Sequence, residues 1–176
     1  MAGRFVWRIA AALVASVMLS ACVESRGPLI TDPRPLLGEQ FEVHLYENFV
    51  DGKASDFHSS TYRWVNGQYE RGTGMARDAK RFVAQALDGS DFLIQSTDDE
   101  GNVYYYWIGR KLAVGVYAIF ALNEADTDKA ARDAICGNDH PEGICRVQKF
   151  DELLTLAKAT AAQPIRKAAL GVVLMK

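Results

Sequence analysis

The sequence is poor in the residues from which catalytic and metal sites are usually built. It contains three cysteines and three histidines among 176 residues, and it has neither a G-x-S-x-G nucleophile motif nor an H-E-x-x-H zinc motif. His44 and His58 could serve in acid–base chemistry only if the fold placed one of them beside a carboxylate. The sequence therefore favours a protein that is not an enzyme and that needs no cofactor and no metal.

An excess of positive charge is also missing. Arg4 and Arg8 are the only charged residues before position 22, so the rest of the chain holds 18 basic and 22 acidic residues. Binding of nucleic acid requires a concentrated basic patch, and this mildly acidic balance argues against it. The 49% hydrophobic and 24% charged composition is that of a folded globular protein.

The amino-terminal residues follow the order of a secretory signal peptide. Arg4 and Arg8 precede Ile9–Leu19, an uninterrupted run of eleven apolar or small residues. A helix that spans a bilayer needs about 20 such residues, so a permanent membrane span is the poorer interpretation. The run ends in Leu19-Ser20-Ala21-Cys22, an aliphatic residue, two small residues and a cysteine.

This ending resembles the lipobox of bacterial lipoproteins. The resemblance implies that residues 1–21 are removed, that Cys22 receives a diacylglyceryl group and an acyl chain such as palmitate, and that the lipid anchors the protein in the cell envelope. In that family an aspartate after the cysteine favours the inner membrane, whereas Val23 here favours the outer membrane, facing the periplasm. The alternative is an ordinary cleaved signal peptide that ends beside a cysteine.

The segment from Val23 to Gly38 contains three prolines and shows neither strand-like alternation nor a helical period. Proline fixes φ and discourages both helices and central strands. We therefore predict that residues 22–38 are a lipidated, proline-rich tether and that residues 39–176 form a single globular domain.

The domain begins with a strand pattern. Phe41, Val43 and Leu45 alternate with polar or mixed residues, the period of two that is typical of a half-buried strand. Asn66-Gly67 is a strong hairpin signal, because a type I′ turn needs positive φ at both central residues. Further strands are predicted near 57–65, 68–71, 81–87, 91–96, 103–109, 112–122 and 165–175.

Helical patterns appear only late in the chain. Residues 129–135 follow the helix-start residues Asp126-Thr127-Asp128, and Gly137 can end that helix. Asp151 can cap a second helix whose apolar face is formed by Leu153, Leu154, Leu156 and Ala157. The predicted fold class is α+β: a curved antiparallel sheet of about six or seven strands, as a meander or partial barrel, with two short helices near the C-terminus.

Cys136 and Cys145 remain as a pair once Cys22 is assigned to lipid. In an oxidising compartment the pair predicts a disulfide. A metal site that includes Asp139 or His140 is the alternative, but the spacing is not that of zinc sites. A free redox pair is disfavoured because the spacing is not C-x-x-C.

Aromatic residues are concentrated in the strand predicted at 103–109. If one face of this strand is exposed, Tyr104, Tyr106 and Trp107 could form a binding platform, because large flat side chains give much contact area at little entropic cost. The alternative is a strand buried on both faces beneath helices.

The predicted function is that of a membrane-anchored envelope lipoprotein that acts as a non-enzymatic binding or structural module. Its partners would be the membrane, reached through the lipid, and an envelope protein, a lipid or a cell-wall component, with no nucleic acid. The alternative is a barrel-like carrier of a small apolar ligand, since barrels of about eight strands can hold one small ligand.

Overall fold

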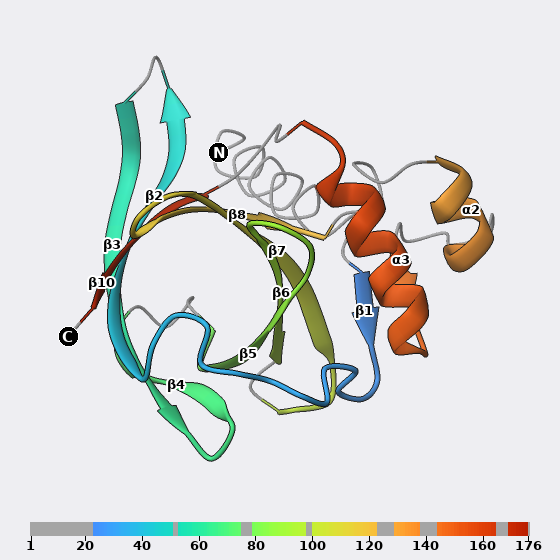
Figure 1. Cartoon of the computed structure of the whole chain (residues 1–176), viewed down its shortest axis with the longest axis horizontal. Coiled ribbons are helices and arrows are strands. Elements are labelled where there is room, and N and C mark those ends of the chain that lie inside the picture. The colour runs from blue at the N-terminus through green and yellow to red at the C-terminus, as the bar shows by residue number, and fades with distance from the viewer. Residues whose placement is uncertain are drawn as a thin grey trace, which may run out of the picture.

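The computed structural model describes residues 23–50, 53–74, 79–97, 100–122, 129–137, 144–164 and 169–175. Among them, ten strands form one sheet and two helices lie on its outside (Figure 1). The elements are β1 (Val23–Ser25), β2 (Gln40–Val50), β3 (Lys53–Val65), β4 (Gln68–Thr73), β5 (Arg81–Ala86), β6 (Asp91–Thr97), β7 (Tyr104–Ala113), β8 (Val116–Ala121), α2 (Lys129–Cys136), β9 (Cys145–Arg146), α3 (Phe150–Ala161) and β10 (Ala169–Met175).

Eight of these strands close into a ring, which we call the barrel. Their order is β6-β5-β4-β3-β2-β10-β8-β7, and β7 pairs again with β6, so that no strand of the eight is left at an edge. Neighbouring strands of the barrel are antiparallel throughout (Figure 1). The α+β class and the curved antiparallel sheet are confirmed, whereas the predicted six or seven strands are too few.

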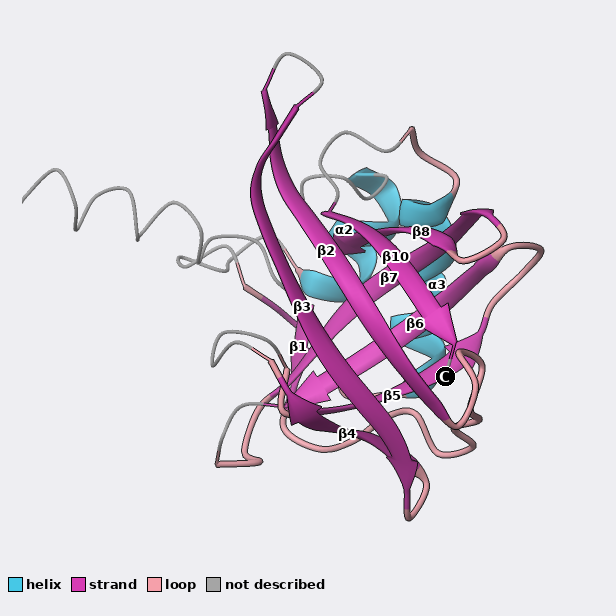
Figure 2. Ribbon diagram, turned by 90° about the vertical axis from the view of Figure 1, so that its left-hand side faces the viewer, coloured by secondary structure: helices cyan, strands magenta, loops and turns pink. Residues whose placement is uncertain are grey.

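Local sequence signals account for the hairpins of the barrel. Asn66 and Gly67 connect β3 to β4 with φ values of 50° and 83°, the conformation that a type I′ turn requires. One predicted strand, 112–122, is divided in two, because residues 114–115 turn the chain between β7 and β8 and Gly115 has φ of 71°. The hairpin of β2 and β3 extends well beyond the rest of the barrel (Figure 2).

Two clusters of buried side chains lie on the two faces of the sheet. The inner cluster fills the barrel and is rich in aromatic rings; it consists of Leu37, Phe41, Val43, Tyr62, Tyr69, Ala84, Phe92 and Ile94. The outer cluster lies between the sheet, the helices and the first residues of the chain; it consists of Val23, Ile30, Leu93, Tyr106, Ile108, Phe120, Leu122, Cys136, Cys145, Val147, Leu153, Leu156 and Ala157.

The second predicted helix is α3, which packs on the outer face of the barrel. Leu153, Leu156, Ala157 and Thr160 are its buried residues, a spacing that places them on one face of a helix. Its first turn is capped by Glu152, whose carboxylate accepts hydrogen bonds from the backbone N–H groups of residues 148 and 149. Asp151 lies inside the first turn instead of capping it.

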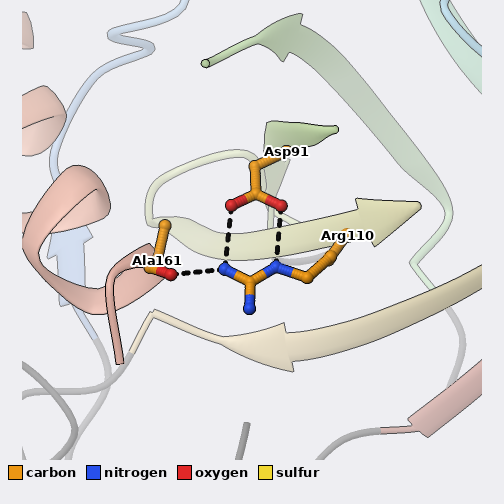
Figure 3. A network of polar contacts seen from close by, with 3 residues as sticks. All are labelled: Asp91, Arg110 and Ala161. Atoms are coloured by element: carbon orange, nitrogen blue, oxygen red, sulfur yellow. Dashed lines mark hydrogen bonds and ion pairs between the residues drawn. The ribbon is translucent and has the colours of Figure 1, made fainter. Parts of the chain in front are cut away.

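Arg110 of β7 fastens the other end of α3 to the barrel. Its guanidinium donates two hydrogen bonds to the Asp91 carboxylate, at 2.8 and 2.9 Å, and another to the carbonyl oxygen of Ala161 (Figure 3). The hydrogen bonds to Asp91 raise the pKa of Arg110 above its ordinary value. Arg110 also lies over the ring of Phe120, 5.9 Å from its centre.

The segment 23–38 is part of the folded body, and the prediction of a tether there is wrong for the described residues. Val23–Ser25 forms β1, and the side chains of Ile30 and Leu37 are buried. The backbone N–H groups of Leu29 and Ile30 donate to the side-chain oxygen of Gln95. The prolines exclude a long strand, but they did not prevent the chain from packing against the sheet.

Candidate functional site

One half of the barrel interior combines apolar and polar side chains, and we call it the mouth. Two of its residues, Ser96 and Trp107, lie near the end of β6 and in the first half of β7. The register of the strands places a set of side chains on this inner face: Leu45, His58, Ser60, Ser96, Trp107 and Ile119.

Trp107 is the most accessible residue of the mouth. It pairs with Ile94 of the inner cluster, so its side chain lies on the inner face, yet 37% of its surface is exposed. Its indole N–H donates a hydrogen bond of 3.1 Å to the hydroxyl of Ser96. The bond fixes the ring orientation, and the ring face stays available for contact with another molecule.

The neighbouring part of the barrel interior is filled by aromatic side chains. Phe41, Tyr62, Tyr69 and Phe82 contact one another ring to ring, with centroid distances of 4.8 to 6.5 Å. Phe41 and Tyr69 are at most 1% exposed.

Residues 34–39 close the filled end. The hydroxyl of Tyr69 accepts a hydrogen bond from the Leu37 N–H and donates one to the Gly38 carbonyl, both 2.9 Å long. The N–H of Trp64 donates to the carbonyl oxygen of Glu39 at 2.7 Å. Burial raises the pKa of Tyr69 to about 12, so this hydroxyl stays neutral and serves as a structural link.

The polar groups of the mouth are buried. His58, Ser60 and Ser96 are at most 7% exposed. His44 lies on the outer face of β2, where its ring nitrogen contacts the carboxylate of Glu42 at 2.9 Å. The carboxylate that acid–base chemistry requires beside a histidine is therefore present at His44. His58 lies on the opposite face of the sheet, so the structure does not bring the two imidazoles together.

The predicted platform of Tyr104, Tyr106 and Trp107 is divided between the two faces of β7. Tyr106 is 2% exposed in the outer cluster, and its hydroxyl hydrogen-bonds the Ser25 hydroxyl at 2.6 Å. Burial raises its pKa to about 12. Tyr104 packs against the same outer cluster. Trp107 alone of the three faces the barrel interior, because successive side chains of a strand point to opposite faces.

The predicted disulfide is present. Cys136 at the end of α2 is bonded to Cys145 of β9, with the two Cα atoms 5.0 Å apart. Both sulfurs are thereby occupied, which argues against the alternative metal site; Asp139 and His140 lie outside the described residues. Within the described part of the chain, no cluster of three or more His, Cys, Asp or Glu side chains could hold a metal ion.

Cys22 also lies outside the described residues, so its lipidation stays a prediction. None of the helices in the described ranges is long and apolar enough to cross a membrane.

No protein-family model, no curated protein and no solved structure matches the chain. Its function must therefore be argued from its own residues.

Sequence reasoning missed the mouth as a site. Trp107 was singled out as part of a platform and His58 only as a possible acid–base residue, whereas Ser96 was not considered. Their shared position depends on which face of each strand is turned inward. Alternation along β6 and β7 could have paired Ser96 with Trp107 on one face. Nothing in the local sequence indicates that this face is the interior of a closed barrel.

Proposed function

We propose that the protein is a lipid-anchored envelope lipoprotein whose barrel binds a small, largely apolar molecule at its mouth. The observation that carries the proposal is Trp107, an aromatic side chain on the inner face that is 37% exposed and held in place by Ser96. An eight-stranded barrel has room for its own side chains or for one small ligand, and aromatic rings of the inner cluster fill another part of this barrel.

The chemistry of the mouth favours an amphipathic ligand such as a single acyl chain. Trp107, Ile119 and Leu45 offer apolar surface, and none of the three is fully buried. The hydroxyl of Ser96 and the imidazole of His58 add buried polar groups on the same inner face. Ligand sites in proteins usually bind through apolar contact and use a few polar groups to orient the ligand.

Quenching of tryptophan fluorescence by a brominated fatty acid tests the ligand site. In the chain from Val23 onward, Trp64→Phe leaves Trp107 as the only tryptophan, and Trp107→Phe leaves only Trp64, at the filled end. We expect saturable quenching of Trp107 and little quenching of Trp64, because a bromine atom quenches only at close range. Equal quenching of both reporters, or none, would refute the site.

Native mass spectrometry of the same chain provides a second readout. A carrier purified from cells is expected to retain an apolar molecule in part of the population, and Trp107→Ser should reduce that bound fraction. A spectrum with the mass of the protein alone, both before and after addition of fatty acid, would count against a carrier.

The lipid anchor is tested separately. Radiolabelled palmitate should be incorporated into the wild-type protein in cells, and Cys22→Ala should abolish the label. Labelling that persists in the Cys22→Ala variant would contradict the lipobox assignment, whatever the barrel binds.

A protein partner is the second candidate, and one observation favours it. At the tip of the β7–β8 hairpin, Leu112 is 51% and Val114 is 92% exposed. Exposed apolar side chains of this size can serve as contacts for another protein. Capture from crosslinked envelopes should recover a specific protein with the wild type and lose it with Leu112→Ser/Val114→Ser; the same recovery from both would exclude the tip.

A further inference from the structure

The first described residue after Cys22 is built into the sheet. Val23 is 0% exposed; it pairs with Cys145 of β9, and its N–H donates a hydrogen bond of 3.1 Å to the carbonyl oxygen of Leu122. The body of the protein therefore begins one residue after the predicted lipidation site.

β1 is held from both sides. It pairs with the start of β7 through Glu24 and Ser25 and with β9 through Val23 and Glu24. The Val147 N–H donates to the Glu24 carbonyl at 2.9 Å, and the Glu24 carboxylate accepts a 2.7 Å hydrogen bond from Arg146. The Ser25 hydroxyl contacts that of Tyr106 in the outer cluster.

The disulfide extends this attachment to α2. Cys145, the register partner of Val23, is bonded to Cys136 at the end of α2. The residue that follows the anchor is thus joined to β9 by pairing, and β9 is joined to α2 covalently. Movement of β1 away from the body would break its pairing with β7 and with β9, and the disulfide keeps β9 itself in place beside α2.

Consecutive Cα atoms are about 3.8 Å apart, so a lipid on Cys22 has no spacer between it and the barrel. We infer that the protein lies directly on the bilayer, with the surface beside the start of β1, formed by α2 and β9, against the lipid headgroups. This inference rests on the proposed lipidation of Cys22. A flexible tether of residues 22–38 would have let the domain move away from the membrane. Because β1 is packed into the sheet, these residues cannot extend in that way.

The exposed side of α2 suits such a contact. Ala130 and Ala134 are exposed and lie four residues apart, which places them on one helical face. Their small uncharged side chains allow close approach to a surface. The β3–β4 hairpin lies on the opposite side of the molecule from α2 (Figures 1 and 2), so its residues provide a control that faces away from the bilayer.

Site-specific photocrosslinking in the full-length protein, expressed in cells, tests this arrangement. A photoreactive phenylalanine derivative replaces Ala134 of α2 or, as the matched control, Arg63, which is exposed near the β3–β4 turn. We expect phospholipid adducts from position 134 and none from position 63. Labelled palmitate is measured in the same samples to verify lipidation.

A second variant increases the distance between the lipid and the folded body without changing the lipidation site. A flexible Gly/Ser linker of about 12 residues, which spans roughly 20 Å on average, is inserted between Cys22 and Val23. Palmitate labelling and the disulfide should persist, whereas the lipid adducts at position 134 should be lost.

Two outcomes would overturn the inference. Palmitate incorporation without lipid adducts at position 134, or with equal adducts from positions 134 and 63, would leave the anchor in place and refute the orientation. Absence of palmitate from the wild type would instead refute the anchor itself, and the orientation with it. Ligand binding at the mouth would be unaffected by either result.

Discussion

Single residues decide how tightly the barrel is filled. Gly109 of β7 is the register partner of Phe92, and the phenyl ring occupies the space where a side chain at position 109 would be. A Cβ atom built there would lie 2.2 Å from the ring of Phe92. The glycine is therefore required by a close approach and not by its backbone angles.

We predict that Gly109→Ala lowers the free energy of unfolding by about 1–3 kcal/mol, the usual cost of overpacking a core. Urea denaturation of wild type and variant measures the difference. Gly27→Ala is the matched control, since a Cβ at position 27 meets nothing within 4 Å, and its stability should be unchanged. A further Phe92→Leu substitution should restore part of the loss; an unchanged midpoint for Gly109→Ala would contradict the packing.

Two buried tyrosines predict loss of stability at alkaline pH. The pKa values of Tyr69 and Tyr106 are raised to about 12 by burial, whereas a tyrosine in the unfolded chain ionises near pH 10. Between about pH 10 and pH 12 the unfolded state loses these protons and the folded state keeps them. The free energy of unfolding therefore falls as pH rises, by up to about 1.4 kcal/mol per pH unit for each tyrosine.

Urea denaturation at about pH 9 and about pH 11 tests this dependence. Tyr69→Phe and Tyr106→Phe each remove hydrogen bonds and should be less stable at both values, but the decrease between the two pH values should be smaller than in the wild type. Identical pH dependence in all three proteins would show that neither hydroxyl is responsible.

At the scale of elements, α3 was the part most readable from sequence. Its apolar residues recur at helical spacing, so Leu153, Leu154, Leu156 and Ala157 were expected on one face. Leu153, Leu156 and Ala157 are buried together, whereas Leu154 is only partly buried. The partner that holds its other end was not visible, because Arg110 is far from Ala161 in sequence. β1 and β9, with three and two residues, are too short for a period to identify them.

We predict that Arg110→Ala destabilises the protein by about 1–3 kcal/mol, the range for hydrogen bonds that involve charged groups. Arg110 and Asp91 are only 23% and 13% exposed, so solvent screens them weakly. Hydrogen exchange should increase most in residues 150–161. Arg34→Ala is the control: its ion pair with Asp32 is 71% and 77% exposed and should contribute between 0 and about 1 kcal/mol. Equal effects of the two substitutions would refute the role of Arg110.

At the scale of the whole molecule, closure of the barrel depends on its last strand. β10 lies between β2 and β8, with six register pairs to β2 and four to β8. A strand predicted near the end of the chain was confirmed, but its position beside the first long strand was not predicted. Without β10 the eight-stranded barrel would open and leave β2 and β8 as two unpaired edges.

We predict that removal of residues 169–176 prevents formation of a stable monomer, because the freed edges of β2 and β8 would pair with other copies. Size-exclusion chromatography and far-ultraviolet circular dichroism should show aggregated or unfolded protein. Removal of Lys176 alone should have no such effect. A monomeric truncated protein with unchanged thermal stability would show that β10 is dispensable.

The sequence by itself determined the features that depend on neighbouring residues. Alternation of apolar residues identified β2, Asn66-Gly67 identified the β3–β4 turn, and helical spacing identified α3. The pair of cysteines left after Cys22 was enough to predict the disulfide. Each of these signals lies within a few residues of the structure that it specifies.

Only the tertiary structure decided which surfaces meet. The insertion of β10 between β2 and β8, the inward position of Trp107 and the packing of β1 all depend on contacts between distant parts of the chain, such as that of Glu24 with Arg146, 122 residues away. Local periodicity shows that a strand has two faces, but which face is turned inward is fixed by the strands and helices that pack against it. For this reason the mouth and the absence of a tether could not be read from the sequence.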